Sequence, residues 1–249
     1  MTDNIEELLN IPKRIFYVWL GGLKSPLANV CLHNWKQKLK DYEIIEINES
    51  SPYFDFEYEY KNCKYFKNRY DNKEWAFVSD YIRCKVLYDY GGIYLDTDVT
   101  VEKDFTPLLK NEFFVGEELP KRAGVGVIGS VKNHQLLKEM LDFYNDKNLN
   151  GGPLIIPDVF EKVLKNYKGN DYKVYPCEYF YPFYLGDEFK EDCLTENTYA
   201  IHWWNNSWAK NPTFFQKVFS VKNEYSKDKT TKYKIITILG KRFKIKSSV

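Results

Sequence analysis

The sequence predicts an α/β fold in which helices flank a central mixed sheet. Three features support this prediction: a strongly apolar strand near the N-terminus, a strand-helix-strand order over the first fifty residues, and a long helix that ends at a glycine pair directly before another strand. Strands that alternate with helices in this way are typical of α/β sheets.

The first strand is expected at residues 14–20, with the sequence RIFYVWL. This aromatic and β-branched run follows Pro12 and ends at Gly21-Gly22, as a strand buried on both faces does. Residues 30–39 then predict a helix, and residues 42–48 predict a second strand.

The helix predicted for residues 74–90 has one apolar stripe, formed by Phe77, Tyr81, Cys84 and Tyr88. It ends at Gly91-Gly92, and a strand over residues 93–101 is expected to follow at once. Because side chains alternate across a strand, Asp96 and Asp98 are expected to share one face near its end.

Further elements are expected along the rest of the chain. The pattern predicts short strands at 113–116, 125–129 and 199–203, and helices at 135–145 and 153–166. We see no linker within residues 1–216, which we therefore predict to form a single domain. Residues 217–249 are predicted to be a basic, partly apolar C-terminal tail.

Composition indicates a folded domain that does not bind nucleic acid. The chain has 249 residues, of which 44% are hydrophobic and 18% aromatic, and its formal net charge is +1. The broad basic surface that nucleic-acid binding requires is therefore not expected. The basic residues gather from Lys217 to the end, where ten lysine and arginine residues accompany only two acidic ones.

Cysteine usage and the N-terminal sequence indicate a cytoplasmic location. The five cysteines are odd in number and widely spaced, which fits neither a disulfide framework nor a zinc site. The opening MTDNIEELLN is acidic where a signal peptide would be basic. The apolar run at 16–23 is shorter than the roughly 20 residues needed to cross a bilayer.

The acidic pair Asp96 and Asp98 is the first candidate site. Carboxylates at the end of a strand in an α/β sheet suit Mg²⁺ or Mn²⁺, with phosphate oxygens completing the coordination shell. The plain alternative is two solvated carboxylates at a turn, since charged residues are usually exposed.

Asp80 and Arg83 form the second candidate pair. They lie one helical turn apart and off the apolar stripe, so both can project from the same edge of the helix. The arginine is suited to phosphate and the aspartate to sugar hydroxyls. The alternative is an ordinary ion pair on the surface, which contributes little.

The motifs around these residues closely resemble glycosyltransferase family 32. The resemblance rests on IPKRIFYVWLGG (11–22) and WAFVSDYIRCKVLYDYGGIYLDTDV (75–99), with the pattern S-D-x-x-R followed by G-G-x-Y-x-D-x-D. The family includes bacterial capsular polysaccharide enzymes and fungal initiating mannosyltransferases, and the clostridial glucosylating toxins are more distant relatives. The resemblance implies that residues 1–216 form a catalytic domain with a nucleotide-sugar-binding fold of the GT-A type.

The resemblance also implies site residues and a metal, Mn²⁺ or Mg²⁺. Asp80 and Arg83 resemble residues that hold donor sugar, ribose or phosphate, and Asp98 the direct metal ligand. Asp96 resembles the carboxylate near ribose and the metal. The remaining donor-binding positions are Trp19, which packs on the base, and Tyr94.

The late segment IHWWNNSW (201–208) resembles the family's loop that closes over the donor diphosphate. There His202 is expected to be a third metal ligand, and Ser207 and Trp208 are expected to donate to the leaving phosphate. Gly151-Gly152-Pro153 resembles the family's turn near the acceptor. The sequence departs from the family at Phe16, where histidine is common, so no role is assigned to that position.

The implied reaction is transfer, with retention of configuration, of a hexose from a nucleotide-diphosphate sugar, with UDP preferred, to a saccharide acceptor. The expected acceptor is a lipid-linked oligosaccharide in cell-surface or capsular polysaccharide synthesis. The basic tail suits contact with an anionic membrane, which would place the protein peripherally on the inner face of the plasma membrane.

Two other classes of function remain open from the sequence. A haloacid-dehalogenase-like phosphohydrolase would use Asp96 as nucleophile, with a second acidic site between Asp187 and Asp192. A non-enzymatic metal- or sugar-binding module would explain the acidic pair but not Arg83. A glycosidase is disfavoured, because neighbouring carboxylates on one strand face cannot flank a glycosidic bond.

Overall fold

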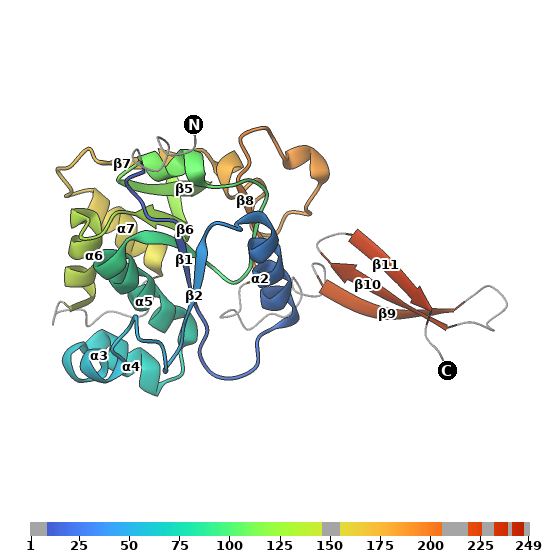
Figure 1. Ribbon diagram of the computed structural model, residues 1–249, viewed down its shortest axis with the longest axis horizontal. Coiled ribbons are helices and arrows are strands. Elements are labelled where there is room, and N and C mark those ends of the chain that lie inside the picture. The colour runs from blue at the N-terminus through green and yellow to red at the C-terminus, as the bar shows by residue number, and fades with distance from the viewer. Residues whose placement is uncertain (1–8, 146–154, 206–218, 226–231, 239–240, 247–249) are drawn as a thin grey trace.

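The computed structural model describes residues 9–145, 155–205, 219–225, 232–238 and 241–246. A six-stranded mixed sheet in the order β2-β1-β3-β6-β5-β7 forms its centre (Figure 1). Its strands are β1 (Arg14–Val18), β2 (Glu43–Ile47), β3 (Gly92–Leu95), β5 (Phe113–Leu119), β6 (Arg122–Ser130) and β7 (Tyr172–Tyr175). The predicted mixed α/β architecture is confirmed.

The pairing of the strands brings several chain segments to one edge of the sheet. β1 pairs in parallel with both β2 and β3, whereas β3 pairs antiparallel with β6 and β6 antiparallel with β5. β7 pairs in parallel with β5. The residues that follow β1 and β3, Trp19 and Asp96, therefore leave the sheet at the same edge.

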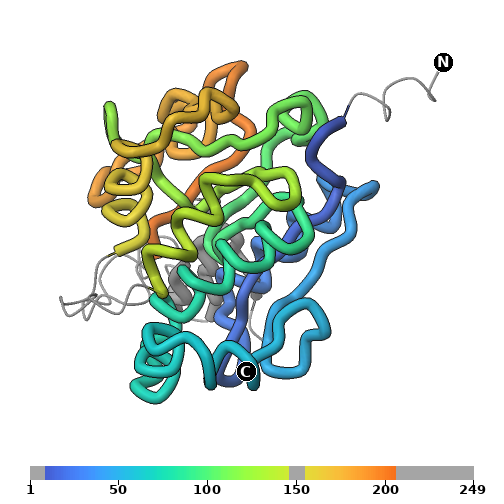
Figure 2. The backbone as a smooth tube through the Cα atoms, turned by 90° about the vertical axis from the view of Figure 1, so that its left-hand side faces the viewer, coloured from blue at the N-terminus to red at the C-terminus, as the bar shows by residue number. Residues whose placement is uncertain are grey.

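Helices cover both faces of the sheet. α2 (Pro26–Lys38) lies on one side, and α5 (Trp75–Tyr90), α6 (Gln135–Asn145) and α7 (Ile156–Leu164) lie on the other (Figures 1 and 2). Side chains of β1 and β3 alternate between two cores. Phe16 and Tyr94 point toward α5, whereas Tyr17 and Leu95 point toward the α2 side.

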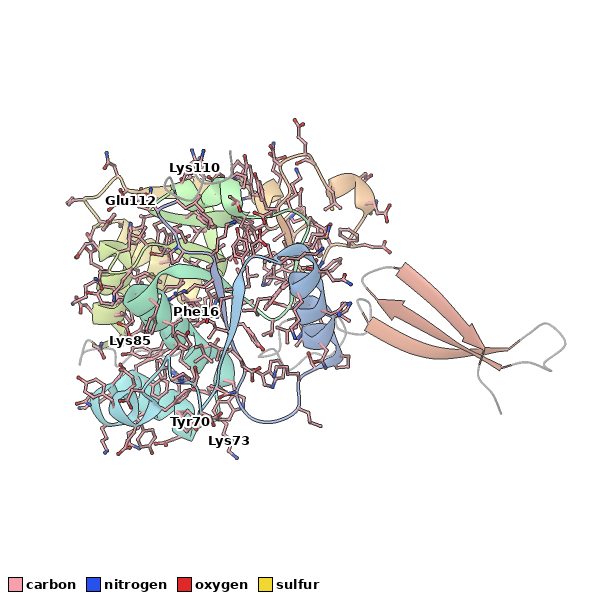
Figure 3. All side chains as sticks on the ribbon, viewed as in Figure 1. Phe16, Tyr70, Lys73, Lys85, Lys110 and Glu112 are labelled. Atoms are coloured by element: carbon pink, nitrogen blue, oxygen red, sulfur yellow. The ribbon has the colours of Figure 1, made fainter. Side chains whose placement is uncertain are left out.

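Phe16 is a core residue. Its side chain is fully buried and its ring packs on Tyr53 and Tyr90, with centroids 5.6 and 6.2 Å away (Figure 3). Phe16, which stands where glycosyltransferase family 32 commonly has histidine, thus contributes to the packing of the core.

Two helix starts, those of α2 and α7, differ from the prediction. α2 begins at Pro26, four residues early, since the Ser25 hydroxyl accepts a hydrogen bond from Ala28 N at 3.1 Å. α7 begins at Ile156 with Pro157 in its first turn. The Gly151-Gly152-Pro153 turn lies outside the described residues.

Two helices, α3 (Phe56–Asn62) and α4 (Lys64–Asp71), were not predicted. Both are short, and α3 depends on a local cap in which Asp55 accepts from Tyr58 N at 2.9 Å. Also unpredicted are β7 and three 3₁₀ turns: η1 (Thr106–Lys110), η2 (Cys177–Tyr179) and η3 (Glu191–Cys193).

The predicted strand over 93–101 is two strands in two sheets. β3 ends at Leu95, and β4 (Val99–Val101) pairs antiparallel with β8 (Ala200–His202). A turn separates them, in which Val99 N donates to Asp96 O at 3.1 Å. The expectation that Asp96 and Asp98 share a strand face is therefore wrong.

α5 is buried on more than one side, so the single-stripe prediction is also wrong. Besides Tyr81 and Cys84, it buries Val78, Ile82 and Val86. The helix lies between the sheet, α4 and α6, which cover it from several directions.

The C-terminal segment forms a separate antiparallel sheet in the order β11-β10-β9. Its strands are β9 (Phe219–Tyr225), β10 (Lys232–Ile238) and β11 (Lys241–Lys246). The predicted tail thus contains regular strands. No helix in the described part of the chain has the length and apolar character needed to cross a membrane.

Gly92→Ala tests the close approach of β3 to β1. Gly92 has a φ of +126°, and a Cβ atom there would lie 2.5 Å from Arg14 Cγ and 2.9 Å from Arg14 O. We expect the free energy of unfolding to fall by about 2–4 kcal/mol, from backbone strain plus the clash.

Gly22→Ala is the matched control. Gly22 has a φ of +111°, but a Cβ atom there would meet nothing within 4 Å. It should lose only the strain, about 1–2 kcal/mol. Equal losses in urea denaturation of the two variants would contradict the close approach.

Candidate functional site

Arg83 lies at the centre of the site and is buried. Its Nη2 is 2.9 Å from Asp80 Oδ1 and 3.2 Å from Asp96 Oδ1, and its Nη1 donates to Val125 O at 2.8 Å. The side chains of Arg83 and Asp80 are only 5% and 9% exposed. The alternative of an exposed surface ion pair is therefore wrong.

Further contacts fix the plane of the guanidinium. Nη2 donates to Ser79 Oγ at 3.1 Å and Nε to Ser79 O at 3.3 Å. The group lies 4.4 Å from the centroid of the Tyr94 ring, and the Tyr94 hydroxyl donates to Asp96 Oδ1 at 2.9 Å. Arg83 and Tyr94 together hold the Asp96 carboxylate in one orientation.

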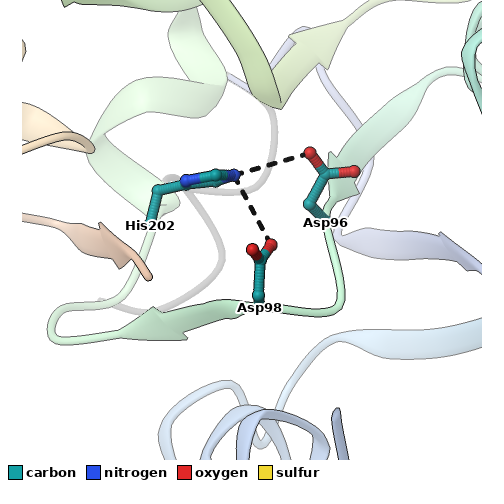
Figure 4. Close-up of side chains that lie close together, drawn as sticks. All are labelled: Asp96, Asp98 and His202. Carbon is teal, nitrogen blue, oxygen red and sulfur yellow. Dashed lines mark ion pairs between the residues drawn. The ribbon is translucent and has the colours of Figure 1, made fainter. Parts of the chain in front are cut away.

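Asp96, Asp98 and His202 form a compact group of ligand atoms at this edge of the sheet (Figure 4). His202 Nε2 lies 3.7 Å from Asp96 Oδ2 and 3.4 Å from Asp98 Oδ1. One oxygen or nitrogen from each residue lies within 4.8 Å of the other two. Two carboxylates and an imidazole suit Mn²⁺ or a similar divalent cation.

The turn between β3 and β4 explains why the two carboxylates converge. Asp96 N donates to Gly126 O at 2.8 Å, which ties the first residue of the turn to β6. On the other side, Asn205 N donates to Asp98 Oδ2 at 2.7 Å and Trp203 N donates to Asp98 O at 2.9 Å. Asp98 is thus fixed by the segment after β8.

Gly126 makes room for the group. A Cβ atom there would lie 2.7 Å from His202 Cδ2 and 2.9 Å from Asp96 Oδ2. The His202 ring also packs against Tyr181 and Trp204, with centroids 5.3 and 4.6 Å away. Any side chain at position 126 would push the imidazole away from the carboxylates.

Trp204 N donates to His202 Nδ1 at 3.3 Å, so in the neutral ring the proton is on Nε2, facing the two aspartates. Binding a cation through Nε2 would replace that proton, and Nδ1 would then carry one and would give up its hydrogen bond from Trp204 N. The carboxylates need no such change. Asp96 and Asp98 therefore fit a cation directly, and His202 fits it after a tautomer change.

Burial and charge set the protonation of the carboxylates. Burial would raise the pKa of Asp96, but Arg83 and His202 hold it at about 2. Burial raises the pKa of Asp98, and the negative charge of Asp96 adds to the effect. Burial lowers the pKa of His202, but Asp98 and Asp96 outweigh it and raise the pKa overall. The carboxylates thus draw positive charge toward them, and a bound cation would supply it directly.

The structure brings together most of the predicted site residues: Asp80, Arg83, Tyr94, Asp96, Asp98 and His202. Trp19 lies at the end of β1, where its indole N–H donates to Gly22 O at 2.9 Å. Ser207 and Trp208 lie outside the described residues. Their roles stay predictions.

Sequence reasoning missed the residues that support the site: Ser79, Gly126, Tyr181 and Asn205. Ser79 stands in the quoted S-D-x-x-R pattern, so its spacing to Arg83 was a usable signal. Asn205 lies in the late segment 201–208 that resembles the closing loop, although no role was predicted for it, whereas Gly126 and Tyr181 come from segments with no local motif.

A second group, formed by Glu112, His134 and Asp171, also has ligand atoms close together. Here the imidazole has structural partners. Nδ1 accepts from Leu136 N at 3.2 Å at the start of α6, and Nε2 lies 3.3 Å from Asp171 O. This group is explained as a cap for α6.

Comparisons with known proteins show that the chain is similar to glycosyltransferases. A family model described as the glycosyltransferase sugar-binding region containing a DXD motif matches residues 27–115. Inositol phosphoceramide mannosyltransferase 3 of Schizosaccharomyces pombe is 30% identical over 124 residues, 49% of this chain and 32% of that protein. An uncharacterized glycosyltransferase of Acanthamoeba polyphaga mimivirus is 27% identical over 219 residues, 80% of this chain and 84% of that protein.

The fold has a solved counterpart in PaToxG glycosyltransferase. The two agree with a TM-score of 0.51 at 20% identity, over 66% of this chain and 74% of the other. The predicted GT-A fold and the resemblance to the DXD glycosyltransferases are confirmed. The chain matches about a third of the length of the fungal relative.

Asp80 predicts a pH dependence of stability. Burial raises its pKa from 3.8 to about 7, although Arg83 opposes the shift. Between these values the folded state binds more protons than the unfolded state, so this contribution is present below pH 3.8 and is lost as pH rises through about 7. Asp80→Asn should remove it.

Urea denaturation of both proteins from pH 4.5 to 7.5 measures the effect. The wild-type free energy of unfolding should fall with pH more steeply than that of Asp80→Asn, by at most about 1.4 kcal/mol per pH unit. The variant is compared with the wild type because the pKa of His202 is also raised, by Asp98 and Asp96, and that contribution is present in both proteins. Parallel slopes would show that Asp80 ionises normally.

Proposed function

Because this chain carries the DXD-containing sugar-binding region and the GT-A fold of glycosyltransferases, we propose that it transfers a hexose from a nucleotide-diphosphate sugar to a saccharide. The preferred donor is a UDP-sugar. The observation that carries the proposal is the meeting of Asp96, Asp98 and His202 beside the buried Arg83.

Asp96 and Asp98 would hold Mn²⁺ or Mg²⁺, with His202 as a third ligand. When bound, the cation neutralises charge that develops on the leaving nucleoside diphosphate. The fit rests on the donor set and on the 3.4 and 3.7 Å distances that separate His202 Nε2 from Asp98 Oδ1 and Asp96 Oδ2.

Arg83 would act on the donor through Asp96. Its N–H groups already bind Ser79, Asp80, Asp96 and Val125, so its main effect here is to orient a carboxylate and keep it charged. The predicted direct contact between Arg83 and phosphate would require one of these bonds to be exchanged. Asp80 and Tyr94 complete the same network.

We propose retention of anomeric configuration. In this route the new bond forms on the face from which the diphosphate leaves, and a leaving phosphate oxygen takes the proton of the acceptor hydroxyl. No dedicated protein base is then required, and none is assigned.

The acceptor proposed is a lipid-linked oligosaccharide of cell-surface or capsular polysaccharide synthesis. The support is compositional: residues from Lys217 onward contain ten basic and two acidic side chains, which suits an anionic membrane surface. This would place the enzyme in the cytoplasm, peripherally on the inner face of the plasma membrane.

The phosphohydrolase alternative finds less support at the same site. Both Asp96 oxygens are engaged, Oδ1 by Tyr94 and Arg83 and Oδ2 by Arg83, which disfavours a nucleophile. Asp187 and Asp192 are exposed and do not join Asp96 in any metal-ligand group among the described residues. A binding module would not require the buried arginine.

Asp98→Asn tests the proposal. It removes one charged ligand without changing side-chain size, so we expect Mn²⁺-dependent hydrolysis of UDP-hexoses to fall by about 100-fold or more, with little change in melting temperature. Asp142→Asn, a surface change on α6, is the control and should keep full activity. Unchanged hydrolysis and metal dependence in Asp98→Asn would reject the metal site.

A further inference from the structure

The order of strands separates the site into a nucleoside side and a saccharide side. In the order β2-β1-β3-β6-β5-β7, Trp19 follows β1 on one side of β3, and β6 and β5 lie on the other. If the metal-bound diphosphate lies at the end of β3, as the proposed function requires, sugar lies over β6 and β5. Residues on that side have not yet been given a role.

Glu118 is the second-last residue of β5. Its carboxylate belongs to a charged chain in which Arg122 bridges Glu118 and Asp158. Arg122 Nε donates to Glu118 Oε1 at 2.7 Å, and Arg122 Nη2 donates to Asp158 Oδ1 at 3.0 Å. The Glu118 side chain is 17% exposed, against 32% for Arg122 and 37% for Asp158. Among described residues, Arg122 is its one hydrogen-bond partner, and it uses only Oε1.

The distance between Glu118 and the metal group can be estimated from Gly124 and Gly126, two glycines of β6 that contact one each. A Cβ atom at Gly124 would lie 2.8 Å from Glu118 Cβ, and one at Gly126 would lie 2.9 Å from Asp96 Oδ2. Two residues of strand span about 7 Å, which is comparable with one hexose ring. Tyr181 joins both positions, because its hydroxyl accepts from Gly126 N at 2.9 Å and lies 2.8 Å from the same Gly124 Cβ.

These observations place the Glu118 Cβ about one sugar ring from the metal group, with the Tyr181 hydroxyl between them. We propose that Glu118 is a specificity-determining residue that accepts a hydrogen bond from a sugar hydroxyl beside the metal-bound diphosphate. Arg122 and Asp158 are positioning residues that orient its carboxylate. The inference rests on the proposed function, and the hydroxyl belongs to the donor hexose or to the acceptor.

Glu118→Gln tests the inference, because the amide keeps the shape but loses the charged acceptor. We expect Mn²⁺-dependent UDP affinity to stay within twofold of the wild type, since UDP lacks the sugar. Removing a hydrogen bond to a charged group should weaken sugar recognition by about 10- to 100-fold. The neighbouring Glu117→Gln is the matched control and should change neither property.

Two assays distinguish the source of the hydroxyl. A selective loss of UDP-hexose affinity relative to UDP assigns the donor hexose. A loss in the rate of transfer to a panel of methyl hexosides, relative to hydrolysis, assigns the acceptor. Arg122→Ala should show the same pattern more weakly, and Arg122→Lys should restore part of it.

The inference is overturned if Glu118→Gln matches Glu117→Gln in both assays. It is also overturned if UDP affinity falls as much as sugar recognition, because the change would then be structural. A wild-type protein that binds neither UDP-hexoses nor GDP-hexoses with Mn²⁺ would instead reject the proposed function, so the two failures are distinguishable.

Discussion

The rest of the site depends on one buried ion cluster, in which Arg83 binds Asp80 and Asp96. An arginine side chain that is only 5% exposed is costly to bury unless charged and polar partners surround its guanidinium. Here Asp80 comes from the same helix, Asp96 follows β3 and Val125 O belongs to β6. The cluster therefore ties α5 to two strands of the sheet and fixes Asp96 before any ligand binds.

The cluster leaves an unbalanced charge at its outer edge. Arg83 supplies one positive charge beside Asp80 and Asp96, and the half-buried Asp98 carboxylate lies 3.4 Å from His202 Nε2. Two nearby carboxylates repel each other in a poorly hydrated site, so a divalent cation is the partner that this arrangement favours. Preorganisation of this kind lets a metal-bound diphosphate meet fixed charges without rearranging the protein.

Much of this could be predicted from local sequence and the rest could not. The spacing of Asp80 and Arg83, the Gly91-Gly92 helix end and the acidic pair all lie within 19 consecutive residues, so their pattern is readable. The turn after Leu95 depends on the pairing of β4 with β8, more than 90 residues away. No local sequence signal predicts it. Tyr181, Asn205 and Glu118 reach the site in the same long-range manner, and short helices such as α3 depend on a single cap.

The central claim is that donor and metal bind together at Asp96, Asp98 and His202. Isothermal titration calorimetry of the wild-type protein with UDP- and GDP-hexoses, with and without Mn²⁺, tests it most directly. The structure predicts that one donor binds tightly only when Mn²⁺ is present, because the carboxylates alone would repel its diphosphate. Binding of no donor, or binding of equal strength without the metal, would contradict this account.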